Sequence, residues 1–154
     1  MNYLRLNVVT VDSVQPERTS MTLKDARVIL KEMKLLEDGW GSLRDGKPIY
    51  IEAIHITNQL LTKLSDYIND KFTIKPLIDG TVCLAWSEGD DDDALLLGLA
   101  VCKHPRIEWF SNVYSDTIDG KYIKYIRGVV RFEDVLDLVK EYHILKEVIG
   151  SSGK

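Results

Sequence analysis

The sequence predicts one α+β domain, in which a single antiparallel sheet of about four to five strands has its helices packed on one face. Three observations support this expectation. The middle of the chain alternates apolar and polar residues with period two, the pattern of half-buried strands. Two earlier segments and one later segment repeat apolar residues at helical spacing. Strands joined by short turns pair antiparallel, so we expect the order β-α-α-β-β-β-β-α.

The first elements follow from local patterns. Tyr3–Val11 alternates as a strand. Thr22 then caps a helix, with Asp25 three residues later completing a short capping box. This helix should end near Asp38-Gly39, because glycine readily adopts the left-handed conformation that ends helices. A second helix is expected from about Tyr50 to Asn69, just after Pro48. The residues expected on its inner face are Ile51, Ile54, Leu61, Leu64 and Ile68.

The rest of the chain predicts the sheet and a last helix. Asp79-Gly80 favours a tight primed hairpin turn, and Pro76 places the first strand of that hairpin at a sheet edge. A turn is expected at Ser115–Gly120 and the last helix at about Phe132–Ile149. Five segments of the middle are expected to be strands, whereas the order above places four strands after the second helix: Thr73–Ile78, Thr81–Ser87, Ala94–Lys103, Arg106–Tyr114 and Lys121–Arg127.

Size and composition limit the class of protein. The 154 residues are about one domain's length, placed here at residues 1–150 with a disordered tail at 151–154. A composition of 45% hydrophobic and 29% charged residues fits neither a disordered chain nor a membrane span. The formal charge of −4 argues against general nucleic-acid affinity. The first 20 residues lack a signal-peptide pattern, and two cysteines, Cys83 and Cys102, make no disulfide framework. We therefore expect a cytoplasmic protein with no membrane partner.

Motifs of known chemistry are missing from the sequence. It contains no phosphate loop, dinucleotide fingerprint, nucleophile elbow or zinc-ligand spacing. The three histidines, His55, His104 and His143, are far apart along the chain. Such sets can still assemble in space, but the pattern itself favours a non-catalytic protein. We expect no catalytic residue, no cofactor and no metal ligand.

The most unusual segment is acidic and lies between two expected strands. Its five carboxylates are Glu88, Asp90, Asp91, Asp92 and Asp93. One interpretation is a solvated loop whose charges keep the adjoining strands from pairing with other chains. A second is a recognition patch for a basic partner surface, whose association it would accelerate. A weak divalent-metal site is a third, although the run does not match calcium-loop spacing.

Tryptophan and basic residues provide further candidates. Trp40 lies between two glycines and is either a core plug or an exposed anchor for a partner. Trp109, on an expected strand, is the second candidate anchor. The run Asp119–Arg131 combines lysines, arginines and tyrosines, which also suit nucleic-acid contact. Strand alternation divides these basic residues between two faces, so we favour a solvated strand.

Two further patterns resemble a known group of proteins. Leu36–Ser42 with Pro48 resembles the pattern W-x-G-x-G/S…P, and Pro76–Trp86 has the form P-x-x-D-G-x-V-x-L-x-W. Over residues 30–90 the chain resembles small uncharacterised bacterial and phage proteins that carry both patterns. Gly39 departs from the Asp or Asn expected near the first tryptophan. The resemblance implies a bacterial or phage setting and transfers no catalytic residue.

These observations lead to a functional hypothesis. We expect a non-catalytic protein-binding module of bacterial or phage origin, such as an antitoxin-like inhibitor or an anti-defence protein. Its acidic segment would bind a protein with a basic surface, and Trp40 and Trp109 would serve as apolar anchors. The alternative is a small enzyme or a ligand- or metal-binding protein that uses His104, Glu108 and Asp79 on the open sheet face. A homodimer is compatible with both.

Overall fold

The computed structural model describes residues 21–88, 95–103, 106–117 and 120–152. Within these ranges, two helices come first: α2 (Leu23–Met33) and α3 (Ile51–Lys63), the latter followed by the short 3-10 helix η1 (Ser65–Tyr67). Five strands follow: β1 (Phe72–Pro76), β2 (Val82–Glu88), β3 (Leu95–Val101), β4 (Ile107–Thr117) and β5 (Gly120–Val130). The 3-10 helix η2 (Phe132–Asp134) then leads into α4 (Val135–Ser152).

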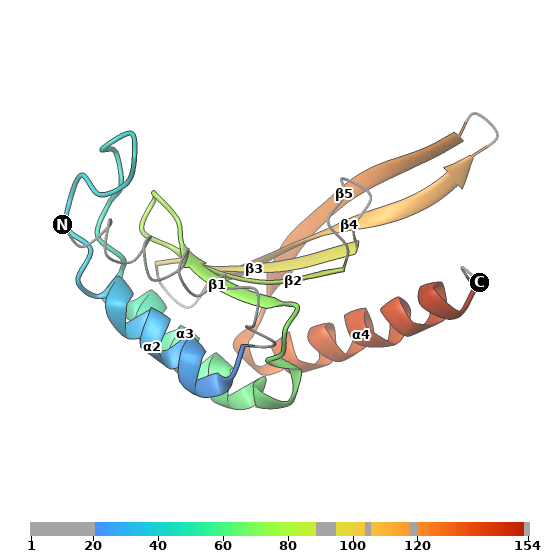
Figure 1. Cartoon of the computed structure of the whole chain (residues 1–154), viewed down its shortest axis with the longest axis horizontal. Helices are drawn as coiled ribbons and strands as arrows, with labels where there is room; N and C mark the ends of the chain where they lie inside the picture. The colour runs from blue at the N-terminus through green and yellow to red at the C-terminus, as the bar shows by residue number, and fades with distance from the viewer. Residues whose placement is uncertain (1–20, 89–94, 104–105, 118–119, 153–154) are drawn as a thin grey trace.

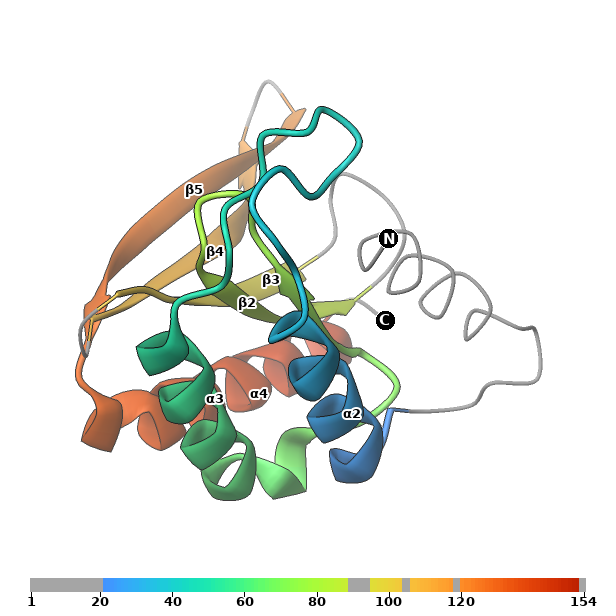
Figure 2. The same cartoon turned by 90° about the vertical axis from the view of Figure 1, so that its left-hand side faces the viewer.

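The predicted fold class is confirmed. The strands form one sheet in the order β1-β2-β3-β4-β5, and every neighbouring pair is antiparallel. All five segments predicted as strands in the middle of the chain are strands, whereas the predicted order of elements places four there. The predicted strand Tyr3–Val11 lies outside the described residues. The helices pack beneath one face of the sheet, and β4 and β5 extend past the other strands (Figures 1 and 2).

Alternation within the strands builds the core between the sheet and the helices. On β2, the side chains of Val82, Leu84 and Trp86 are buried against the helices, as their spacing predicts. The equivalent positions of β3 are Leu97, Leu99 and Val101, all at most 1% exposed. Removing this much apolar surface from water is the main stabilising contribution to a fold of this kind.

Helix α2 begins as predicted and ends earlier. The Asp25 backbone N–H donates to the Thr22 hydroxyl, and the Thr22 N–H donates to the Asp25 carboxylate, both at 3.1 Å. These two bonds are the reciprocal capping box. The helix ends at Met33, before Gly39. After it, the N–H groups of Lys34, Leu35 and Leu36 donate to carbonyls three residues back in place of four, and the Leu36 side chain is buried.

The predicted second helix extends too far, and one of its inner-face residues is wrong. Helix α3 ends at Lys63 and not near Asn69, so Ile68 lies beyond it and is only partly buried against the core. Ile51 is 61% exposed, whereas Ile54, Leu61 and Leu64 are buried as expected. The buried stripe also includes Ala53, Thr57 and Leu60. At about 100° per residue, Ile51 lies roughly 120° around the helix from the centre of that stripe. It therefore faces away from the sheet.

The β1–β2 connection differs from the expected two-residue turn. The Gly80 N–H donates to the Leu77 carbonyl at 3.0 Å, and the Leu77 N–H donates to the Thr81 carbonyl at 2.9 Å. Three residues therefore form the loop, and Gly80 has φ 92°, a left-handed conformation that favours glycine. Pro76 is on β1, an edge strand of the sheet, as predicted.

Strands β4 and β5 are longer than predicted. They pair along eleven rungs from Ile107↔Val130 to Thr117↔Gly120, so no turn begins at Ser115. Strand β3 accompanies β4 only as far as Leu97↔Ser111. At the next position the Leu96 N–H donates to the Asn112 side-chain oxygen, and the Ser111 hydroxyl donates to the Leu96 carbonyl. Beyond these two bonds β3 no longer pairs with β4. Strands β4 and β5 continue together as a two-stranded ribbon (Figure 1).

The last helix buries Val135, Val139 and Tyr142, which recur at helical spacing. It continues to Ser152, past its predicted end at Ile149 and into the predicted tail 151–154. Within the described ranges, no helix combines the length and apolar character that crossing a membrane requires.

Candidate docking surface on the open face of the sheet

The face of the sheet opposite the helices carries two rows of aligned residues across β2 to β5. One row is Cys83, Ala100, Glu108 and Val129, and the other is Ala85, Gly98, Phe110 and Arg127. Neighbours in a row point to the same side and lie within contact distance of one another. Small residues on β2 and β3 thus adjoin large and charged ones on β4 and β5.

Phe110 is positioned by the glycine next to it on β3. A Cβ atom added to Gly98 would overlap the Phe110 ring, so the ring lies directly over the glycine backbone. On the opposite face, a Cβ added to Gly128 would lie 2.8 Å from Nε1 of Trp109. Each glycine therefore makes room for an aromatic ring on the neighbouring strand, one on each side of the sheet.

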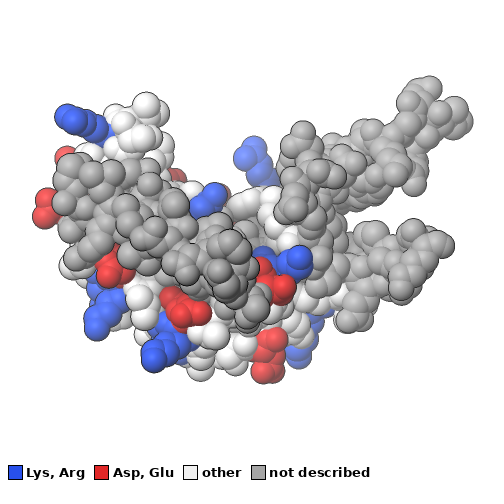
Figure 3. Space-filling model, in the orientation of Figure 1, with Lys and Arg blue, Asp and Glu red and all other residues white. Residues whose placement is uncertain are grey.

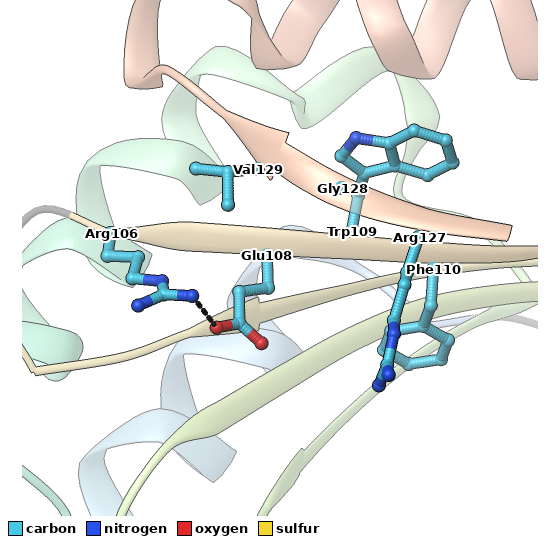
Figure 4. A pocket seen from close by; sticks show the side chains of 7 residues that line it. All are labelled: Arg106, Glu108, Trp109, Phe110, Arg127, Gly128 and Val129. Atoms are coloured by element: carbon cyan, nitrogen blue, oxygen red, sulfur yellow. Dashed lines mark ion pairs between the residues drawn. The ribbon is translucent and has the colours of Figure 1, made fainter.

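A hollow of about 440 Å³ lies over β4 and β5. Figure 4 shows Glu108, Phe110 and Arg127 pointing to the same side, while the Trp109 indole points to the other. Arg106 and Glu108 form an ion pair of 2.9 Å, and both side chains are exposed. Surface pairs of this kind contribute little stability, so the pair is free to rearrange around a ligand. The full lining is Arg106, Glu108, Trp109, Phe110, Arg127, Gly128 and Val129.

Of the two proposed anchors, Trp40 is buried in the core of the protein. It is 8% exposed, and its indole N–H donates to the Lys47 carbonyl at 2.5 Å. Its backbone also bridges to Gly46, which closes the loop after α2. This is the core-plug alternative, and it leaves almost no indole surface for a partner.

The second anchor, Trp109, is only half-buried. It packs against the core from the helix-facing side of β4, next to β5. Trp109 therefore keeps part of its surface exposed, on the strand next to the free edge of the sheet.

For the acidic segment, the structure describes only the strands on either side of it. Strand β2 ends at Glu88 and β3 begins at Leu95. Asp90, Asp91, Asp92 and Asp93 lie outside the described residues, and so does His104. The prediction that this segment contacts a basic partner remains open.

Two residues of the alternative site lie at the other end of the sheet, around Cys102. Burial raises the pKa of the Cys102 thiol, and the negative charges of Glu108 and Asp79 raise it further. A thiol with a raised pKa is mostly protonated at neutral pH and is a poor nucleophile. The Asp79 carboxylate accepts bonds from the Thr81 N–H at 3.2 Å and hydroxyl at 2.7 Å, so it is engaged in the turn. Within the described part, no three His, Cys, Asp or Glu side chains gather as metal ligands.

Sequence reasoning missed most of the hollow. The predicted strands Arg106–Tyr114 and Lys121–Arg127 included Phe110 and Arg127 and ended before Val129. A strand pattern also does not tell which residues of two strands lie opposite each other. That register places Phe110 beside Arg127 and Glu108 beside Val129. The glycine at position 98, inside an otherwise apolar run, was the available signal, because a strand glycine often marks a close approach.

Comparison with known proteins adds no identity to this geometry. No known protein family, curated protein or solved structure matches the chain. The suspected resemblance to small bacterial and phage proteins therefore stays a prediction.

On the face seen in Figure 3, basic and acidic side chains are interspersed over the helical part of the molecule.

Proposed function

We propose that this chain is a non-catalytic protein-binding module that docks partners on the open face of its sheet over β4 and β5. The observation that supports this proposal is the composition of that surface. It places an aromatic ring, an exposed valine and an arginine side by side in one hollow. Aromatic residues and arginine are enriched where proteins bind one another, and Val129 is 62% exposed.

The chemistry around the hollow supports binding better than catalysis. Arg106 and Glu108 neutralise each other, and burial raises the pKa of the Cys83 thiol on the same face. An antitoxin-like or anti-defence role is the more specific part of the proposal, and it depends on the resemblance alone. The alternative function, a small ligand or metal binder, predicts a raised melting temperature in a thermal-shift screen against divalent metals and nucleotides.

The proposal can be tested by site-specific photo-crosslinking in cells that naturally encode the protein. Benzoylphenylalanine would replace Val129 in one variant and Ile144, on α4, in the other. Both positions are 62% exposed, so they sample solvent equally well. A discrete crosslinked protein from position 129, and little from position 144, supports the docking surface. Equal labelling from both positions, or none from 129, would refute it.

The acidic segment is tested with the partner that this experiment identifies. A variant with Asp90, Asp91, Asp92 and Asp93 changed to asparagine should bind a basic partner more slowly at low salt. The difference should shrink at ~0.5 M salt, where the Debye length is only a few ångströms. Association rates that are equal at both salt concentrations would show that the segment serves solubility and not recognition.

A further inference from the structure

The free edge of β5 is the longest unpaired strand edge in the described part of the sheet. Strand β5 has eleven residues and pairs there with β4 alone. An open edge presents backbone N–H and C=O groups that can pair with another chain. Which residues present them follows from the hydrogen-bonding order of the sheet.

That order is set by one bond at the start of β4. The Cys102 N–H donates to the Arg106 carbonyl at 3.0 Å, so the backbone of Arg106 faces β3. Backbone groups of successive residues point to opposite sides of a strand. Glu108 and Phe110 therefore also face β3, while Ile107 and Trp109 face β5.

The partners of Ile107 and Trp109 on β5 are Val130 and Gly128. These residues therefore bond to β4, and the residues between them face outward. Arg127 and Val129 thus direct their N–H and C=O groups to the free edge. Both also line the open-face hollow with their side chains. One edge therefore combines free backbone groups with a cationic and an apolar side chain.

Apolar surface is left open on both sides of this edge. On the open face Val129 is 62% exposed, and on the helix side Ile126 is 37% exposed. Half-buried Trp109 lies beside Gly128, which has no side chain to cover it. A strand added along β5 would cover all three apolar side chains at once.

The charge of β5 selects the occupant. From Gly120 to Val130 strand β5 has three basic residues and no acidic one: Lys121, Lys124 and Arg127. A second copy of this chain would bring the same positive charges to the edge. Like charges on adjacent strands are destabilising, and opposite charges are stabilising. An acidic segment therefore fits this edge better than a second copy does.

We propose that an extended acidic segment of the partner protein adds to β5 as a sixth strand of the sheet. This inference rests on the proposed protein-binding function and names its ligand. The partner would place a carboxylate beside Arg127, an apolar residue over Gly128 and Trp109, and a second apolar residue beside Val129. Backbone pairing supplies affinity in such strand addition, and the alternate side chains supply specificity.

The probe is a display library of random peptides of about ten residues, the length of a long strand. It is selected on the full chain, and the enriched sequence is then made as a blocked peptide for affinity measurement. We expect enriched peptides to carry two consecutive apolar residues next to a carboxylate. The carboxylate comes first if the peptide runs parallel to β5 and last if it runs antiparallel. Absence of enriched peptides, or enrichment of basic ones, would overturn the proposal.

Variants at the two outward-facing residues test the geometry. Val129→Pro removes an outward N–H without removing a bond to β4, and proline is tolerated at strand edges. It should weaken binding of the peptide about tenfold or more, whereas the matched control Val129→Thr keeps the N–H and should bind within about twofold. Arg127→Glu should weaken binding about as much as the proline variant, and it decides the outcome if that variant fails to fold.

The outcomes separate this inference from the proposed function. Crosslinks from position 129 together with peptides indifferent to Val129→Pro and Arg127→Glu would keep the docking surface and refute strand addition. A dimer of the chain that Val129→Pro dissociates would show that a second copy occupies the edge, and would also refute it. Loss of both crosslinks and peptide binding would refute both proposals.

Discussion

Gly98→Ala should destabilise the protein through one contact, the ring of Phe110. The added methyl group overlaps the ring, so the ring must leave its place on β3. Full burial of a side chain such as phenylalanine is worth about 1.5–3 kcal/mol, and Phe110 is half-buried. With some strain from the displaced ring, the free energy of unfolding should fall by roughly 1–2 kcal/mol.

The contact can be isolated by a double-mutant cycle with Phe110→Ala. Without the ring, Gly98→Ala should be neutral or stabilising by roughly 0.5–1 kcal/mol, because alanine loses less backbone entropy in a strand than glycine does. Urea unfolding followed by tryptophan fluorescence gives the four free energies, and the slopes show whether unfolding remains two-state. An equal cost of Gly98→Ala with and without the ring would refute the packing argument.

Three further changes should have defined outcomes. Thr57→Val should stabilise the protein by about 1 kcal/mol, because the Thr57 hydroxyl is fully buried and has no hydrogen-bond partner in the described structure. Thermal unfolding measures the change, and a lower melting temperature would contradict this expectation. Trp40→Phe should cost about 1–2 kcal/mol, since it removes the hydrogen bond to the Lys47 carbonyl and part of a buried ring. Unchanged stability would show that the loop needs only an aromatic ring at this position. Glu108→Gln should speed alkylation of Cys102 at pH 8, because removing the negative charge lowers the pKa of the thiol and increases the thiolate fraction. The alkylation rate is read by mass spectrometry of the Cys102 peptide. An unchanged rate would indicate that burial alone controls the thiol.

The elements that sequence predicted well are those with local causes. The Thr22 capping box depends on residues three apart, and the strand pattern of β2 on side chains two apart. Both kinds of signal are complete within a few residues. Errors occurred where tertiary packing decides. Ile51 has the right residue type for a core, but the helix turns it away from the sheet.

At the candidate site, too, local patterns were predictable and tertiary neighbours were not. Glu108 and Phe110 are two residues apart in a predicted strand, so they share a face of β4. The strand pattern could not show that Arg127 lies opposite Phe110, since cross-strand register depends on residues far apart in sequence. Trp40 illustrates the converse. Its residue type suggested an interface anchor, but a backbone carbonyl seven residues later holds it inside the loop.

The two edges of the sheet are protected differently, and the difference bears on function. Strand β1 is short and carries Pro76, which lacks a donor, and α2 packs beside it. Each of these features discourages pairing with any other strand. Strand β5 is twice as long and, in its described side chains, is protected chiefly by the charge of Arg127. A positive charge repels copies of the same strand but attracts an acidic one, so it discourages self-association while leaving the edge open to a chosen partner. If solubility alone had shaped this edge, proline or a shorter strand would have served equally well. For this reason Val129→Pro is the most informative substitution in the chain: it gives β5 the protection that β1 already has.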